Sequence, residues 1–278
     1  MSKKTLCIII VSLNPGDKLE TTLKSIFAQR FEDYTVIVKD GGSGDGSIER
    51  LKDGGMLEGR DNVHIVVSGD KGIYDGMNQA VEEMKKFTDA GYCIFMNCGD
   101  VFHDDEVLLK MEGFLKDHEE PHIIYGDQYN PAQGSVISSA PEINDFALFR
   151  NVPCHQVCFY DVRLFENRAY DTSYRVRADY EHFLYAVYKM QAKTVHVPVV
   201  ICDYEGGGFS ETAQNRKISA EEHRKITDIY MPKQAAGYRA VMLLTLAPLR
   251  TKMAESPVFS KTYNTVKSFL YRKKGNKQ

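Results

Sequence analysis

The chain has 278 residues, of which 43% are hydrophobic and 26% are charged, and its formal net charge is −3. These values are typical of a globular protein with one sizeable core, and they exclude a chain that is disordered throughout. No apolar run approaches the roughly 20 residues that a membrane-spanning helix needs, so we expect no such span.

The N-terminus and the cysteines favour a cytoplasmic protein. Two lysines and a brief apolar run open the sequence, but polar residues follow without a small-residue cleavage pattern. We therefore interpret the start as a first strand and not as a signal peptide. The six cysteines lie mostly inside apolar segments, which suits reduced core residues better than a disulfide framework.

The first hundred residues alternate between short β-branched runs and apolar patterns of helical spacing. The runs predict strands over residues 6–11, 35–39, 63–68 and 92–96. Helices are predicted over residues 17–29, 48–52 and 77–84, and beyond the acids at 104–106. Repeating strand–helix units predict an α/β fold with a Rossmann-like, doubly wound, mainly parallel sheet flanked by helices. Ligands of such sheets bind outside the carboxyl ends of the strands.

From residue 122 onward the strand–helix rhythm changes. Strands are predicted over residues 122–126, 157–160 and 194–202, and a helix over residues 179–189. From Lys233 to the end there are ten basic residues and one acid, which leaves 25 basic and 37 acidic residues in the rest of the chain. We therefore divide the chain into a body, residues 1–232, and a basic helical C-terminal tail, residues 233–278.

Three polar clusters follow predicted strands, so they should meet at one edge of the sheet. The first is the glycine-rich run at residues 40–47. Gly42, Gly44 and Ser47 only approximate the G-x-G-x-x-G fingerprint, and they follow the second strand instead of the first, so a dinucleotide site is weakly supported. A flexible surface turn is the alternative. Asp40, however, stands where a carboxylate could accept hydrogen bonds from a base or a ribose.

The second and third clusters, at residues 69–75 and 97–100, add more acids. Asp70, Lys71 and Asp75 either line the ligand site or belong to a solvated loop. Asp100 stands at the tip of the fourth strand, where its oxygens could coordinate a divalent ion that bridges two phosphates. The alternative for Asp100 is a cap of the following helix.

Two positions in the second half of the chain are further candidates. Asp179 begins a predicted helix, so it either interacts with the helix dipole or faces the cleft as a general base. His155 and Gln156 precede a predicted strand, where they could bind a ligand or form hydrogen bonds within the core.

Taken in order, these segments resemble the inverting family 2 glycosyltransferases, which have the GT-A fold. The matching segments are Ser12-Leu-Asn-Pro15, Ser25-Ile-Phe-Ala-Gln29, Lys39 to Ser47, Asp70 to Asn78, Asn97-Cys-Gly-Asp100, Cys154-His-Gln156 and Ala178-Asp-Tyr-Glu181. The resemblance spans roughly residues 5–230, and it is especially close to the branch that builds colanic acid, capsule and O-antigen polysaccharides. It implies a nucleotide-binding half, residues 1–100, and an acceptor-binding half, residues 101–232.

The resemblance implies roles for the acids. The residues that it assigns to nucleotide binding are Asn14, Asp40, Asp70 and Lys71, with Asp40 on the base. Asp100 takes the metal position of the family's Asp-x-Asp segment and would hold Mg²⁺ or Mn²⁺, although Asn97 and Gly99 replace other acids there.

The resemblance also implies a catalytic base and contacts with the sugars. Asp179 takes the position of the catalytic base, and Ala178 stands where the family usually has Glu. The candidates for contacts with donor or acceptor sugar are His155, Gln156, Tyr180, Glu181, Gly207 and Ser210. The last two belong to a glycine-rich segment, residues 206–210, which is expected to form a flexible loop over the donor.

The implied function is transfer of a sugar from a nucleotide-sugar donor to a hydroxyl of a growing glycan, with Asp179 as the base and inversion of the anomeric carbon. In the tail, apolar residues stand among lysines and arginines, which suits helices on an anionic membrane surface. A lipid-linked acceptor of the undecaprenyl type would be presented there. We therefore expect a peripheral protein at the inner face of the plasma membrane, without a nucleic-acid partner.

Each of these inferences has an alternative. The tail could be solvated, or its helices could pack on the body. The chain could be a catalytically silent sugar-nucleotide binding or scaffold protein, in which Asn97 and Ala178 mark the decay of an active site. A dinucleotide-dependent oxidoreductase is the third possibility.

Overall fold

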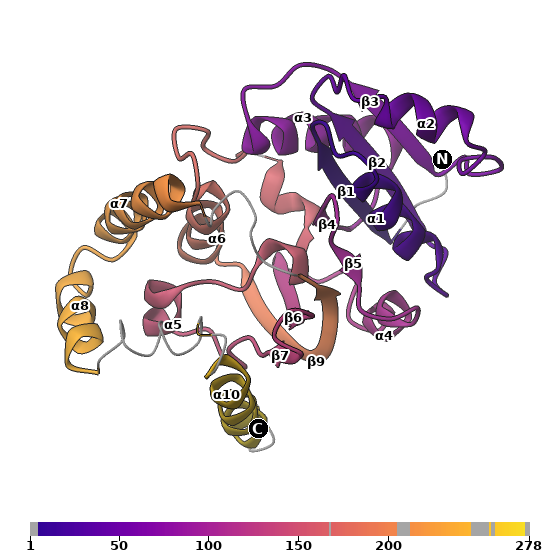
Figure 1. Ribbon diagram of the computed structural model, residues 1–278. Helices are drawn as coiled ribbons and strands as arrows, with labels where there is room; N and C mark the ends of the chain where they lie inside the picture. Colours follow the sequence, from indigo (N-terminus) through magenta and orange to yellow (C-terminus); the bar gives the residue numbers. More distant parts are fainter. Residues whose placement is uncertain (1–4, 167, 205–211, 246–255, 257–258, 276–278) are drawn as a thin grey trace.

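A single mixed sheet with helices on both faces forms the centre of the computed structural model, which describes residues 5–166, 168–204, 212–245, 256 and 259–275 (Figure 1). Within these residues the sheet has nine strands, β1 (Leu6–Ser12), β2 (Tyr34–Asp40), β3 (Val63–Val67), β4 (Tyr92–Asn97), β5 (Val101–Phe102), β6 (His122–Asn130), β7 (Ser135–Ile137), β8 (Cys158–Asp161) and β9 (Lys193–Asp203). They are ordered β3-β2-β1-β4-β8-β6-β9-β5, and β7 pairs with β6.

Helices lie in the connections between these strands and after the last strand, β9. They are α1 (Lys18–Phe27), α2 (Ser47–Asp53), α3 (Ile73–Phe87), α4 (Val107–Glu112), α5 (Asp145–Arg150), α6 (Ala178–Lys189), α7 (Ala213–Tyr230), α8 (Ala235–Leu244), α10 (Ser260–Gly275) and the 3₁₀ helices η1 (His155–Val157) and η2 (Val162–Phe165). Because strand crossovers are right-handed, α1 and α2 lie on one face of the first strands and α3 on the other (Figure 1). Every predicted strand and helix of the first hundred residues is present.

The parallel half of the sheet brings the polar clusters together. β1 pairs in parallel with both β2 and β4, and β2 pairs in parallel with β3. In this register Ser12 stands opposite Asp40, Val11 opposite Asn97, and Asp40 opposite Val67. The four strands therefore end at the same edge, and the loops that follow them share one end of the molecule.

The second half of the sheet is mixed, which differs from the mainly parallel sheet predicted from the sequence. β8 is antiparallel to both β4 and β6, β5 is antiparallel to β9, and β6 is parallel to β9. β5 and β7 were not predicted, because strands of two and three residues have no recognisable period. β5 pairs with β9, which is distant in sequence, whereas β7 forms a hairpin with the preceding strand β6.

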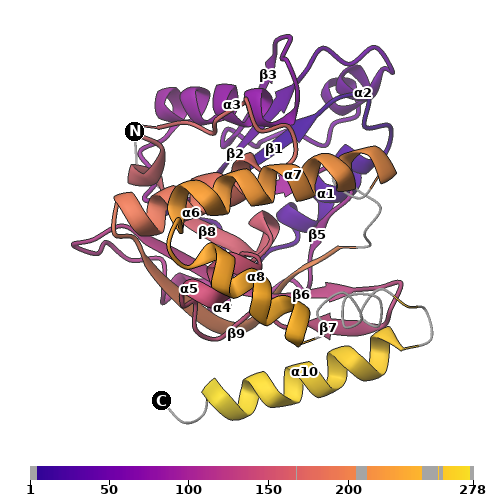
Figure 2. The same cartoon turned by 90° about the vertical axis from the view of Figure 1, so that its left-hand side faces the viewer.

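The described part of the tail forms the helices α8 and α10, as predicted, and both contact the body. The Tyr238 ring of α8 lies 5.3 Å from the rings of both Phe146 and Phe149 of α5. In α10, buried Asn264 donates a hydrogen bond of 2.9 Å to Gln133, beside β7. Figure 2 shows α7, α8 and α10 along one side of the molecule. None of the helices in the described ranges has the length and apolar character needed to span a membrane.

Candidate active site

Asp40 is fully buried and shapes the glycine-rich turn that follows β2. Oδ1 accepts hydrogen bonds from the hydroxyls of Ser12 (2.8 Å) and Ser43 (2.6 Å), and Oδ2 accepts them from the backbone N–H groups of Gly42 (2.9 Å) and Ser43 (2.7 Å). Burial raises the pKa of the Asp40 carboxyl, but these hydrogen bonds lower it more, so the pKa lies below its ordinary value. A charged Asp40 thus holds the turn in its shape, and its direct contact with a base stays a prediction.

Asn14 joins the loop after β1 to the same turn. Its N–H donates to Ser43 Oγ over 2.7 Å, and its side-chain oxygen accepts from the Gly44 N–H over 2.9 Å. The residue adopts a positive φ of 48°, a conformation that asparagine tolerates better than most residues. The two loops therefore form one exposed wall at the edge of the sheet.

Asp70 forms an ion pair with the buried side chain of Lys39, which is not among the predicted site residues. Lys39 Nζ is fully buried and donates to Asp70 Oδ2 (3.1 Å), to the Ser68 carbonyl (2.7 Å) and to the Asp40 carbonyl (3.2 Å). Lys39 thereby links the ends of β2 and β3. Its signal in the sequence is a lysine inside an otherwise apolar strand, which needs an anionic partner when it is buried.

Two glycines make room for the Asp70 carboxylate. A Cβ on Gly41 would lie 2.8 Å from Asp70 Oδ2, and a Cβ on Gly76 would lie 2.8 Å from Val11 Cγ1 and 3.2 Å from Asp70 Oδ2. The next residue, exposed Lys71, donates its backbone N–H to the Asp75 carboxylate over 2.8 Å. The loop between β3 and α3 therefore presents one largely buried acid and one exposed cation at the site.

Asp100 lies in the same cluster, in contact with the segment that η1 contributes. Its Oδ2 accepts a hydrogen bond of 2.9 Å from the Gln156 amide, and only 8% of the residue is exposed. Burial raises the pKa of the Asp100 carboxyl above its ordinary value, although the hydrogen bond from Gln156 lowers it in part. Asn97 contacts His155 through Nδ2 and Nε2, 3.2 Å apart. Two of the predicted sugar-contacting residues thus lie beside the predicted metal position.

Asp179, in the first turn of α6, is held from two sides. His155 Nδ1 lies 3.3 Å from Oδ2, and the Tyr74 hydroxyl lies 2.8 Å from Oδ1. His155 thus lies between Asn97 and Asp179, with one ring nitrogen toward each. Burial raises the pKa of Asp179, but the contacts with His155 and Tyr74 lower it more, so the pKa lies below its ordinary value. One quarter of the side chain is exposed, which leaves an ionised carboxylate accessible.

The segment before α6 is fixed by Glu222 of α7, which is also not among the predicted site residues. Its carboxylate accepts hydrogen bonds from three consecutive backbone N–H groups, those of Arg175 (2.6 Å), Val176 (3.0 Å) and Arg177 (2.9 Å). A carboxylate at the N-terminus of a helix is stabilised by these donors and by the helix dipole. Nothing in the local sequence around Glu222 indicates this contact, which joins residues 45 to 47 positions apart.

Tyr180 and Glu181 are not brought to this cluster. The Tyr180 hydroxyl is buried and donates to the Leu148 carbonyl over 2.8 Å. The Glu181 carboxylate is 3% exposed and lies between Arg168, at 2.7 Å, and the hydroxyl of Tyr230. Their contacts with sugars stay predictions. Gly207 and Ser210 lie outside the described residues.

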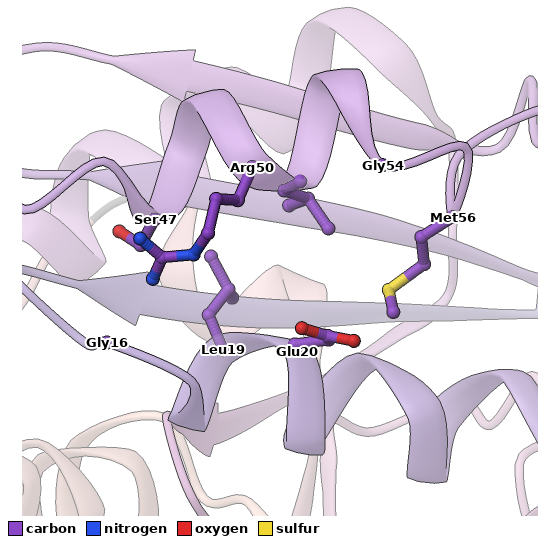
Figure 3. A pocket seen from close by; sticks show the side chains of 8 residues that line it. Gly16, Leu19, Glu20, Ser47, Arg50, Gly54 and Met56 are labelled. Atoms are coloured by element: carbon purple, nitrogen blue, oxygen red, sulfur yellow. The ribbon is translucent and has the colours of Figure 1, made fainter.

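A small cavity lies beside the glycine-rich turn, between α1 and α2 (Figure 3). Its volume is about 100 Å³, and its lining includes Leu19, Glu20, Arg50 and Met56. None of the predicted nucleotide, metal or base residues lines it. The polar cluster at the strand ends, and not this cavity, is the candidate active site.

Comparison with known sequences gives a consistent family match. The sequence profile described as Glycosyl transferase family 2 matches residues 7–159, which is more than half of the chain. A PGL/p-HBAD biosynthesis glycosyltransferase of Mycobacterium bovis (strain BCG / Pasteur 1173P2) is 27% identical over 222 residues, which cover 78% of this chain and 84% of that protein. An uncharacterized glycosyltransferase of Mycobacterium tuberculosis (strain ATCC 25618 / H37Rv) is 26% identical over 243 residues, which cover 86% and 88%.

Solved structures share the fold. S. aureus TarS 1-349 in complex with UDP-GlcNAc superposes with a TM-score of 0.60 at 13% identity, covering 84% of this chain and 69% of that one. The mannosyltransferase PcManGT from Pyrobaculum calidifontis, in complex with GDP-Man and Mn²⁺, has a TM-score of 0.59 at 12% identity, with 95% and 85% covered. The chain spans 43% of a longer TarS chain. At such identities these likenesses establish the fold alone.

Proposed function

Because the chain belongs to glycosyl transferase family 2, we propose that it moves a sugar from a nucleoside diphosphate donor to an acceptor hydroxyl with inversion, using Asp179 as the general base. It is a glycosyltransferase with the GT-A fold. The observation that carries the proposal is the position of Asp179, which His155 links to the cluster of Asn97 and Asp100. The proposed base and the residues proposed to face the leaving group thus belong to one site.

The proposed reaction is a single displacement at the anomeric carbon. The acceptor oxygen forms the new bond while the bond to the diphosphate oxygen breaks, and Asp179 takes the hydroxyl proton. A positioned general base contributes about 100- to 10,000-fold to the rate. The lowered pKa of Asp179 keeps it ionised and ready to accept that proton at neutral pH.

For the donor, we propose that the nucleotide lies on the wall formed by the loops after β1, β2 and β3. Exposed Asn14 and Lys71 would contact it directly, while Asp70, paired with Lys39, would face it from the floor. Asp40 would act through the turn that it holds. The neighbours TarS and PcManGT were solved with UDP-GlcNAc and GDP-Man, which supports a nucleotide-sugar donor for this chain.

We propose that Asp100 is the carboxylate that holds Mg²⁺ or Mn²⁺. In the described part of the chain, no three His, Cys, Asp or Glu side chains come together as a metal site. A single buried carboxylate fits a cation that takes its other ligands from substrate phosphates and water, as Mg²⁺ does. When bound there, such a cation would supply charge neutralisation for the departing diphosphate.

Because the cation would take most of its ligands from the phosphates, we expect the metal and the nucleotide to bind together. The thermal unfolding temperature of the full chain should rise when one of UDP, GDP or TDP is added with Mn²⁺, because ligands stabilise the native state by mass action. It should change little with Mn²⁺ alone. Asp100→Ala should lose the metal-dependent part of the shift, whereas the matched control Asp105→Ala, a neighbouring acid, should keep it. Equal shifts with and without metal would contradict the assignment of Asp100. No shift with any nucleoside diphosphate, combined with a shift by NAD, would overturn the donor class.

We also propose a lipid-linked glycan acceptor, in cell-surface polysaccharide biosynthesis of the capsule or O-antigen type, presented at the inner face of the plasma membrane. The tail, residues 233–278, supports this because its packed helices expose apolar side chains. In α8, Leu243 and Leu244 are 69% and 82% exposed, and in α10 Phe269 is 66% exposed. Lysines in the same tail would attract anionic lipid headgroups.

Vesicle binding tests this surface. The full chain is expected to sediment with phosphatidylglycerol vesicles more than with phosphatidylcholine vesicles, and less at high salt, because headgroup attraction is screened. The double variant Leu243→Gln and Leu244→Gln should bind severalfold less, since it removes exposed apolar area. The control Leu109→Gln changes an exposed leucine of α4 and should bind normally. If the double variant binds vesicles as well as the unchanged protein does, α8 does not take part in membrane binding.

A further inference from the structure

Tyr74 connects the nucleotide-binding loop to the proposed base. It lies in the first turn of α3, four positions after Asp70, and only 8% of it is exposed. Its hydroxyl oxygen is 2.8 Å from Asp179 Oδ1 and 2.8 Å from the Val176 carbonyl, although these residues are 105 and 102 positions away in sequence. The contact therefore spans the two halves of the molecule.

We propose that Tyr74 is a positioning residue that occupies Oδ1 of Asp179, so that Oδ2 is the oxygen that takes the proton of the acceptor hydroxyl. The inference rests on the proposed role of Asp179 as the base. Oδ1 accepts from the Tyr74 hydroxyl and from the Tyr180 N–H, each at 2.8 Å. These two donors use both lone pairs of Oδ1. Oδ2 has His155 Nδ1 at 3.3 Å, and it keeps capacity for one more proton.

The geometry also favours the ionised form of the base. The Tyr74 hydroxyl has one proton and two acceptors, Asp179 Oδ1 and the Val176 carbonyl. A carboxylate is the stronger acceptor, so Tyr74 donates to Asp179 while the base is ionised. Once the base is protonated at Oδ2, Oδ1 becomes an ordinary carbonyl oxygen, and the Tyr74 proton can turn to Val176. Because Glu222 fixes the N–H groups of residues 175–177, the Val176 peptide is a firm support for Tyr74.

A neighbouring tyrosine distinguishes this role from ordinary packing. The ring of Tyr170 lies 5.5 Å from that of Tyr74, and it is also buried. Within the described part of the chain, its hydroxyl makes no hydrogen bond. The cluster therefore tolerates a buried hydroxyl without a partner, and Tyr170→Phe is a matched control for Tyr74→Phe.

The environment of Asp179 defines what a pH profile can report. The titratable groups that face it are His155, Tyr74, Tyr170, Tyr160, Cys154, Cys158 and His182. Burial raises the pKa of each of these tyrosines and cysteines, so they stay neutral in acid. Burial lowers the pKa of His182 to about 4. Tyr170 contacts the His182 ring, so the same control also reports any effect through His182.

The test compares Tyr74→Phe, Tyr170→Phe and Asp179→Asn in the full chain with the donor found by thermal shift. Tyr74→Phe should lower kcat about tenfold or more, because it removes a hydrogen bond to a charged group. It should also move the acid limb of the kcat/KM profile to higher pH, since the Asp179 carboxylate loses a donor. Binding of the nucleoside diphosphate should not change, because the ring and the Asp70 loop remain.

Each outcome separates the inference from the proposed function. If Asp179→Asn keeps full activity, the assignment of the base is wrong. If Asp179→Asn is inactive but Tyr74→Phe behaves like Tyr170→Phe in kcat and in pH profile, only the positioning role is wrong. Should Tyr74→Phe fail to fold, 3-fluorotyrosine at position 74, a stronger donor, should move the acid limb to lower pH. An unmoved limb in that protein would equally overturn the inference.

Discussion

Asp179→Asn is expected to lower kcat by about 100- to 10,000-fold, the range that a positioned general base contributes. Asparagine has the shape of aspartate, and its amide oxygen can still accept the hydrogen bond that Tyr74 now donates to Oδ1. The amide cannot take a proton from the acceptor hydroxyl. The fold and the donor site should therefore survive while the chemical step is lost.

The measurement is release of nucleoside diphosphate from the donor in the presence of the acceptor lipid fraction, together with nucleotide binding followed by thermal unfolding. Binding by Asp179→Asn should match that of the unchanged protein. As a control, Asp228→Asn alters a half-exposed acid of α7 that pairs with Arg239, and it should leave turnover unaffected. Normal turnover by Asp179→Asn would instead mean that another group removes the proton, or that none is needed.

Lys39→Met is expected to destabilise the fold by about 3–5 kcal/mol, the cost of removing one partner from a buried ion pair. The substitution leaves the Asp70 carboxylate, 11% exposed, without its cation. It also removes the donor shared by the carbonyls of Ser68 and Asp40. Methionine fills most of the space of the lysine stem, so the loss reflects charge and hydrogen bonding more than packing.

Urea unfolding followed by circular dichroism measures this difference. The double variant Lys39→Met with Asp70→Asn is the decisive control, because it removes the unpaired charge. It should be more stable than Lys39→Met alone, although it should bind the nucleotide less well. If the single and the double variant unfold at the same urea concentration, the ion pair does not support the ends of β2 and β3.

The sequence by itself determined the first half of the fold and the place of the site. Short β-branched runs and helical spacing are local properties, and they are sufficient to predict β1 to β4 and the helices between them. Because parallel strands end at one edge, the clusters at residues 40–47, 69–75 and 97–100 could be placed together before any contact was known. The motifs in their order also indicated the family, which the profile match confirms.

The tertiary structure alone decided which partner each polar group has. Asp40 and Asp70 stand at the ends of adjacent strands as similar acids, yet Asp40 accepts hydrogen bonds from its own turn and from Ser12, whereas Asp70 pairs with Lys39. The contact of Tyr74 with Asp179 joins residues 105 positions apart. Such contacts depend on long-range register and side-chain packing, which no periodicity within one segment encodes. Local patterns fix where the strands end, and packing between distant segments fixes which carboxylate is buried, charged and free to react.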